Sequence, residues 1–122
     1  MGDLTANFSE SEFACKCGQC DRPYAMEPNF IALLQNARED AGVSFNITSG
    51  YRCPLHEESI KRPTSSHTRG LAADIATPNS QVRHDILKAL LRYFSRIGIG
   101  KDFLHVDADH NQPAEVVWDY YG

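Results

Sequence analysis

The sequence lacks the features expected of a nucleic-acid-binding or membrane protein. It has 12 lysines and arginines against 16 aspartates and glutamates, a net charge of -4, so there is no basic surplus to contact phosphates. No apolar run approaches the roughly 20 residues needed to span a membrane. The first eight residues have neither a basic start nor an apolar core, so we expect no signal peptide and a protein that is cytoplasmic as synthesised.

The cysteines are few but unevenly distributed. Cys15, Cys17 and Cys20 are close in sequence, and Cys53 is alone. Without a signal peptide, four cysteines favour metal binding or thiols over disulfides. The spacing C-x-C-x-x-C differs from the usual paired C-x-x-C of zinc ribbons, so three alternatives stay open: a second metal, one disulfide, or free thiols. The 122 residues suit a single domain over residues 1–122, with a core that needs no disulfide.

Hydrophobic periodicity predicts an α+β protein. Helices are expected where apolar residues recur every three to four positions, and strands where they alternate with polar ones. The order suggests helices packed on one face of a small, mostly antiparallel sheet. The expected elements are a short helix opened by the capping box Ser9–Glu12, a helix from Pro28 to about Ala41 capped by Gly42, a strand over Val43–Ile47, a loop-rich stretch over Ser49–Arg69, a strand over Leu71–Ile75, a helix from Asn79 or Ser80 to about Arg96 ended by Gly98 and Gly100, and strands over Phe103–Asp107 and Glu115–Asp119.

Three residues are candidate metal ligands. Asp74 lies within an apolar strand, where a carboxylate is costly unless it is paired or binds a metal. His67 is in the loop just before this strand. His105 lies on another predicted strand, flanked by the core residues Leu104 and Val106. Two histidines and one carboxylate form a common shell for catalytic zinc (Zn2+), which leaves a fourth position open for water.

Other interpretations of these residues stay open. Asp74 could pair with Arg69 or Arg52 and merely hold a loop, and a lone strand histidine is usually structural. A zinc hydrolase also needs a carboxylate that takes a proton from water, and Asp102 and Asp107 are the candidates. The remaining histidines are competing ligands, although His84 falls on the polar side of its predicted helix: His56, His84 and His110.

The motif Ser65-x-His67-x-x-Gly70-x-Ala72-x-Asp74 resembles the S-x-H-x-x-G-x-A-x-D signature of the zinc D-alanyl-D-alanine peptidase family. This family includes D-Ala-D-Ala carboxypeptidases and the L-alanyl-D-glutamate endopeptidases of phage lysins. Further similarity to its compact single-domain branch runs from about Phe8 to Tyr120, in three segments: Phe8–Phe13 with the cysteines after it, Ser49–Arg52, and Phe103–Asp107.

The resemblance implies a role for each matching residue. His67, Asp74 and His105 would bind zinc. Arg52 would bind a substrate carboxylate or stabilise the oxyanion, and Ser65 would orient the loop. Several branches place the general base three residues before the last histidine ligand, at the position of Asp102. A regular strand would point Asp102 away from that ligand, so Asp107, which shares its face, remains the rival base or a residue that hydrogen-bonds a ligand.

The implied fold is that of the D-alanyl-D-alanine peptidases and the hedgehog signalling domain. The implied function is zinc-dependent hydrolysis of a peptide bond in bacterial peptidoglycan stem peptides, by a monomer that could reach the cell wall after phage-type release. Some proteins of this fold keep the zinc without peptidase activity. The alternative is therefore a non-catalytic zinc-bearing module that binds a cell-wall peptide or partner, and a third hypothesis is a structural metal protein organised by its cysteines.

Overall fold

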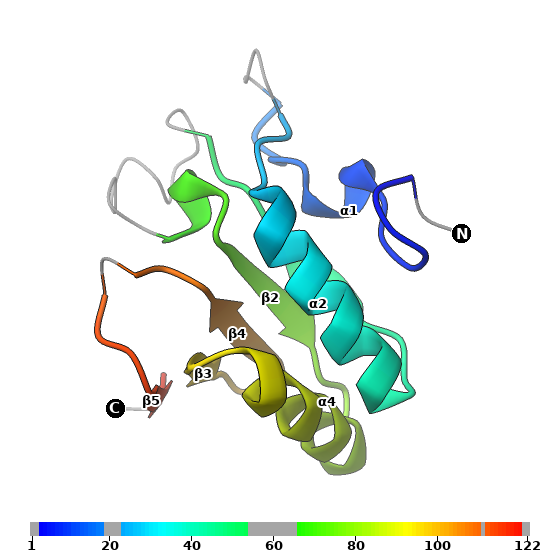
Figure 1. Ribbon diagram of the computed structural model, residues 1–122, viewed down its shortest axis with the longest axis vertical. Helices are drawn as coiled ribbons and strands as arrows, with labels where there is room; N and C mark the ends of the chain where they lie inside the picture. The colour runs from blue at the N-terminus through cyan, green and yellow to red at the C-terminus, as the bar shows by residue number, and fades with distance from the viewer. Residues whose placement is uncertain (1–2, 19–22, 54–65, 111, 121–122) are drawn as a thin grey trace.

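A computed structural model describes residues 3–18, 23–53, 66–110 and 112–120. In this part of the chain, a five-stranded sheet is covered on one face by two long helices (Figure 1). The fold is thus α+β, as predicted. The elements are α1 (Glu10–Phe13), α2 (Pro28–Ala41), β1 (Ile47–Ser49), a 3-10 turn η1 (Ser66–Arg69), β2 (Ala72–Ala76), α4 (Ser80–Tyr93), β3 (Arg96–Ile99), β4 (Phe103–Asp107) and β5 (Val116–Asp119).

Local sequence signals set the helix ends. The Ser9 backbone N–H donates to Glu12 Oε2 over 2.7 Å, within the predicted capping box of α1. Pro28 occupies the first turn of α2, and Gly42 ends that helix in the left-handed conformation, which costs glycine little. The Asn79 side chain accepts a hydrogen bond from the Val82 backbone N–H at the start of α4. These predicted boundaries are confirmed.

The sheet has the strand order β1-β2-β4-β3-β5, and every pair is antiparallel except β3 with β5. Side chains alternate between its faces. One face packs against α2 and α4 to form the core, through Ala73, Ile75, Ile97, Leu104, Val106, Phe30, Leu34, Ile86 and Leu90. Residues one position along each strand therefore lie on the opposite face. Among the described residues, no helix has the length and apolar character needed to cross a membrane.

The structure corrects the predicted end of the second long helix. This helix, α4, ends at Tyr93 rather than near Arg96, and Phe94 already has an extended backbone. Arg96–Ile99 forms β3, a strand that the sequence reasoning missed, with Gly98 inside it. The apolar stripe of α4 runs into the alternating pattern of β3 without a break, which hid the boundary.

The strand expected over Val43–Ile47 is also shifted. It begins at Ile47 and runs to Ser49, because pairing with β2 joins Ile47 to Ile75 and Ser49 to Asp74. Phe45 is buried, but in a connecting segment. The end of the expected loop-rich stretch forms the turn η1. Three residues discussed above lie outside the described residues: Cys20, His56 and Ser65.

Candidate metal centre

The register of the sheet brings Asp74 and His105 together. They are direct partners on β2 and β4, and His105 pairs with Gly98 on β3, which in turn pairs with Trp118 on β5. These four residues form one row across the sheet, on the face opposite the helices. A Cβ on Gly98 would lie 2.7 Å from Trp118 Nε1, so glycine leaves room for the indole, whose ring centre is 5.5 Å from that of His105.

The turn η1 presents His67 to this row. The His67 Nδ1 atom lies 2.7 Å from the carbonyl oxygen of Gly50. A carbonyl oxygen can only accept, so Nδ1 carries the proton and Nε2 keeps its lone pair. The backbone of Arg52 also donates to the carbonyl oxygen of His67. The segment after β1 thus fixes both the position and the tautomer of this histidine.

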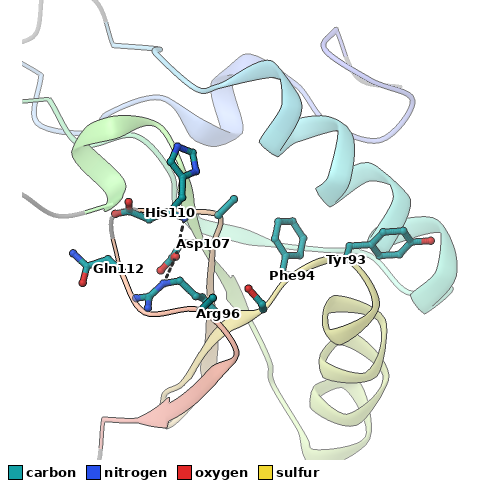
Figure 2. A pocket seen from close by; sticks show the side chains of 10 residues that line it. Tyr93, Phe94, Arg96, Asp107, His110 and Gln112 are labelled. Carbon is teal, nitrogen blue, oxygen red and sulfur yellow. Dashed lines mark hydrogen bonds and ion pairs between the residues drawn. The ribbon is translucent and has the colours of Figure 1, made fainter.

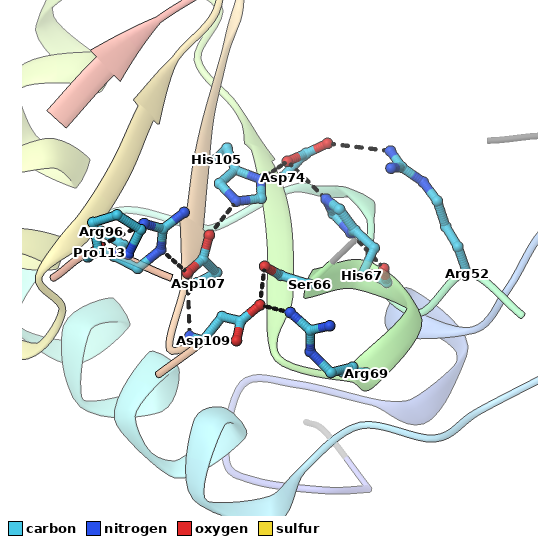
Figure 3. A network of polar contacts seen from close by, with 11 residues as sticks. Arg52, Ser66, His67, Arg69, Asp74, Arg96, His105, Asp107, Asp109 and Pro113 are labelled. Atoms are coloured by element: carbon cyan, nitrogen blue, oxygen red, sulfur yellow. Dashed lines mark hydrogen bonds and ion pairs between the residues drawn. The ribbon is translucent and has the colours of Figure 1, made fainter. Parts of the chain in front are cut away.

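The ring of His105 lies between two carboxylates, those of Asp107 and Asp74. His105 Nε2 lies 2.7 Å from Asp107 Oδ2, and His105 Nδ1 lies 3.0 Å from Asp74 Oδ1 (Figure 3). When Nε2 donates its proton to Asp107, the lone pair of Nδ1 faces the Asp74 carboxylate. Two acceptors at this distance repel unless a proton or a cation joins them. This arrangement therefore favours a cation beside Nδ1.

We call His67, Asp74 and His105 the ligand triad. His67 Nε2 is 3.4 Å from Asp74 Oδ1, and one donor atom from each of the three residues lies within 4.8 Å of the others. All three side chains are mostly shielded from solvent, with exposed fractions of 5%, 14% and 9%. Two neutral imidazole nitrogens and one carboxylate are a fitting donor set for zinc.

The electrostatics of the triad favour a negative carboxylate and positive charge beside it. Burial would raise the pKa of Asp74, but contacts with His105 and His67 outweigh it and hold this pKa far below its usual range. Burial would lower the pKa of His105, but hydrogen bonds with Asp107 and Asp74 raise it.

A second polar network lies behind His105. Asp107 Oδ1 accepts from Arg96 Nε over 2.6 Å and from the backbone N–H of Asp109. Burial would raise the pKa of Asp107, but His105 and Arg96 lower it. Asp109 is itself buried and accepts from Ser66 and Arg69 (Figure 3). This network links β3, β4 and η1, and it fills both oxygens of Asp107.

The two candidate bases occupy different surroundings. Asp107 is 1% exposed and contacts the ring nitrogen of His105 that points away from Asp74. Asp102 is exposed, in the bend before β4, where its carbonyl oxygen accepts from the Thr77 backbone. Among the described residues, the Asp102 side chain makes no hydrogen bond or ion pair with the ligand triad.

Arg52 lies at the edge of the triad. Its guanidinium is 3.6 Å from Asp74 Oδ2, on the side of the carboxylate away from His105. A hollow of about 210 Å³ adjoins it and is lined also by Lys16, Ser49 and Tyr51. A cationic side chain that contacts Asp74 and also lines this hollow suits recognition of a carboxylate.

The other predicted residues lie elsewhere. His84 is on the exposed side of α4 beside Asp85. His110 lines a separate hollow of about 280 Å³, together with Arg96 and Asp107, behind the second network (Figure 2). Sequence reasoning missed Arg96 and Trp118. The pairing of Arg96 with Asp107 depends on β3, a strand that the sequence pattern did not predict, so no signal for it was available.

A family model described as peptidase M15 matches residues 6–107. The chain belongs to the peptidase M15 family. Its members are zinc metallopeptidases, and the matched region contains the whole ligand triad. The resemblance inferred from the motifs is therefore confirmed at the level of the family. No curated protein sequence matches the chain.

Proposed function

We propose that this chain hydrolyses a peptide bond in the stem peptides of bacterial peptidoglycan, with one zinc ion held by His67, Asp74 and His105. The carrying observation is the convergence of His67 Nε2, Asp74 Oδ1 and His105 Nδ1. Membership of the M15 family supports a peptidase rather than another zinc hydrolase. A D-Ala-D-Ala carboxypeptidase and an L-Ala-D-Glu type endopeptidase both fit this proposal.

Bound zinc would polarise the scissile carbonyl and lower the pKa of a water molecule towards about 7. The chain's own residues would do the rest. Gly50 and Asp107 would accept the ring protons of the two histidines, which would leave the lone pairs of His67 Nε2 and His105 Nδ1 to bind the metal. Arg52 would bind a substrate carboxylate or the developing oxyanion beside Asp74.

We assign the general base to Asp102 and a positioning role to Asp107. Both oxygens of Asp107 are already occupied, by His105 and by Arg96. It also lies on the far side of the imidazole from Asp74, so it is badly placed to accept a proton from a water at the triad. Asp102 is exposed in the bend before β4, so its carboxylate would have to move towards the triad when substrate binds before it could accept this proton.

One observation favours a second candidate function. Neither Asp102 nor Asp107 presents a carboxylate towards the open side of the triad in the described residues. A zinc-bearing module that binds a cell-wall peptide without cutting it would have the same geometry. The two functions differ in whether Asp102 is needed for turnover.

The test is digestion of purified peptidoglycan by the zinc-loaded protein, with products identified by mass. We expect cleavage by the wild type, loss of zinc and of cleavage in His67→Ala, and loss of cleavage with zinc retained in Asp102→Ala. Binding to peptidoglycan without any cleavage product would support the second candidate. Full cleavage by Asp102→Ala would refute the assignment of the base.

A further inference from the structure

Three cysteine sulfurs meet in a cluster of their own, separate from the ligand triad. Cys15 and Cys17 follow α1, and Cys53 follows β1. Their Sγ atoms all lie within 4.8 Å of one another, although 36 residues separate Cys17 from Cys53. We call these three residues the thiol cluster.

The spacing of the sulfurs suits a metal better than a disulfide. Cys17 Sγ and Cys53 Sγ are 3.3 Å apart, whereas a disulfide bond is about 2.05 Å long. Zinc–sulfur bonds of about 2.3 Å in a tetrahedron place neighbouring sulfurs about 3.8 Å apart. The distance between Cys17 Sγ and Cys53 Sγ is close to this value, so a small movement of the sulfurs would let them bind one ion.

The surroundings also suit thiolates held by a metal. Cys15 and Cys53 are buried, and Cys17 is partly buried. The backbone N–H of Cys53 points at Cys15 Sγ over 3.4 Å, and such N–H donors stabilise the negative charge that a thiolate carries to a metal. Three converging sulfur ligands are soft donors, which zinc accepts readily.

We propose that the thiol cluster binds a second zinc ion, which has a structural role and is separate from the ligand triad. Each of the three thiols releases its proton to solvent as the sulfur binds the metal. The ion closes a link between the segment after α1 and the segment after β1. It requires no turnover, so the proposal stands whether or not the chain is a peptidase.

The position of the thiol cluster connects it to the ligand triad. Cys53 directly follows Arg52, whose backbone N–H donates to the carbonyl oxygen of His67. Gly50, three residues before Cys53, accepts from the His67 ring, and the Tyr51 backbone donates to Phe13. A metal at the cluster would fix the Cys53 end of this short segment, Gly50–Cys53. Its loss should therefore loosen the part of the chain that orients His67.

Cobalt substitution gives a readout that the ligand triad cannot produce. Sulfur-to-cobalt charge transfer absorbs strongly in the near ultraviolet, whereas histidine and carboxylate ligands give no such band. Protein purified anaerobically, stripped of metal and titrated with Co2+ should develop this band, and zinc should bleach it. Native mass spectrometry of the zinc form should show two ions per chain.

Three variants separate the two sites. His67→Ala should keep the charge-transfer band at full strength and lose one zinc. Cys17→Ser should lose most of the band and also one zinc. The neighbouring variant Lys16→Gln is the matched control for metal content, because the Lys16 side chain contacts the Thr48 carbonyl oxygen rather than the sulfurs, and it should keep the full charge-transfer band and both zinc ions.

The wild-type spectrum decides the proposal even when a variant fails to fold. No charge-transfer band in the reduced wild type would overturn it. An undiminished band in folded Cys17→Ser would also overturn it. So would a Cys17–Cys53 linked peptide found by mass spectrometry in the anaerobically purified protein, because that result would identify a disulfide instead.

Discussion

Asp107→Asn tests how the second network supports the ligand triad. The carboxylate uses one oxygen for His105 Nε2 and the other for Arg96 Nε, at 2.7 and 2.6 Å. Asparagine has nearly the same shape but only one acceptor oxygen. Whichever way the amide turns, its NH2 group faces a donor, either the His105 ring or the Arg96 guanidinium. The variant therefore keeps the packing and loses the fixed tautomer of His105.

The expected loss can be estimated from the contact that disappears. A buried hydrogen bond to a charged group contributes about 1.5–3 kcal/mol, and about 1.4 kcal/mol corresponds to a tenfold change in a binding constant. We therefore expect zinc at the ligand triad to bind about 10–100-fold more weakly, the range typical of residues that orient a metal-bound histidine.

Competition with a chromogenic chelator measures this affinity. Cys17→Ser is used as the background, so that only the ligand triad is titrated. Asp85→Asn, on the outer side of α4 beside His84, is the matched control and should bind zinc like the background protein. An Asp107→Asn variant that is folded and binds zinc with unchanged affinity would refute the positioning role.

Three further predictions concern the fold around the site. Gly98→Ala should destabilise the protein by about 1–3 kcal/mol in urea unfolding, because the new Cβ would lie 2.7 Å from the neighbouring indole nitrogen; an unchanged midpoint would contradict the row across the sheet. Leu90→Ala should lower the free energy of unfolding by about 2–5 kcal/mol, since Leu90 is fully buried. The control is Leu91→Ala at the exposed neighbouring position, which should change the free energy of unfolding by no more than about 0.5 kcal/mol. Equal effects of the two variants would contradict the packing of α4. Tyr93→Phe should lower stability at pH 7, because the Tyr93 hydroxyl donates to Asp40 and lowers the pKa of that carboxyl. The difference should persist above the ordinary value of 3.8 and fade as the pH falls through the lowered pKa; a difference that is constant with pH would contradict this linkage.

The sequence was sufficient for most of the fold because its signals are local. The proline and glycine at the ends of α2, and the asparagine that caps α4, act within a few residues of themselves. The end of α4 was mispredicted because apolar residues continue from the helix into β3. The point at which the helix gives way to a strand depends on the pairing of β3 with β4. The local sequence pattern does not encode this contact between distant residues.

The candidate site divides in the same way. His67, Asp74 and His105 could be proposed from residue type and motif, and the structure brings them together. The distinction between Asp102 and Asp107 could not be made, because it depends on the contacts of Asp107 with the His105 ring and Arg96 and on the exposure of Asp102. Asp107 pairs with Arg96, which lies on the strand that the sequence pattern did not predict. This ion pair could therefore be recognised only in the structure.

The proposed function requires that the ligand triad hold a zinc ion that supports hydrolysis of a cell-wall peptide. The most direct test is a mass-spectrometric assay of a purified peptidoglycan stem peptide incubated with the zinc-loaded wild type, before and after removal of the metal by a chelator. We expect one defined cleavage product that disappears with the metal and returns when zinc is restored. An intact peptide in the zinc-loaded sample, or a product that forms equally without metal, would contradict it.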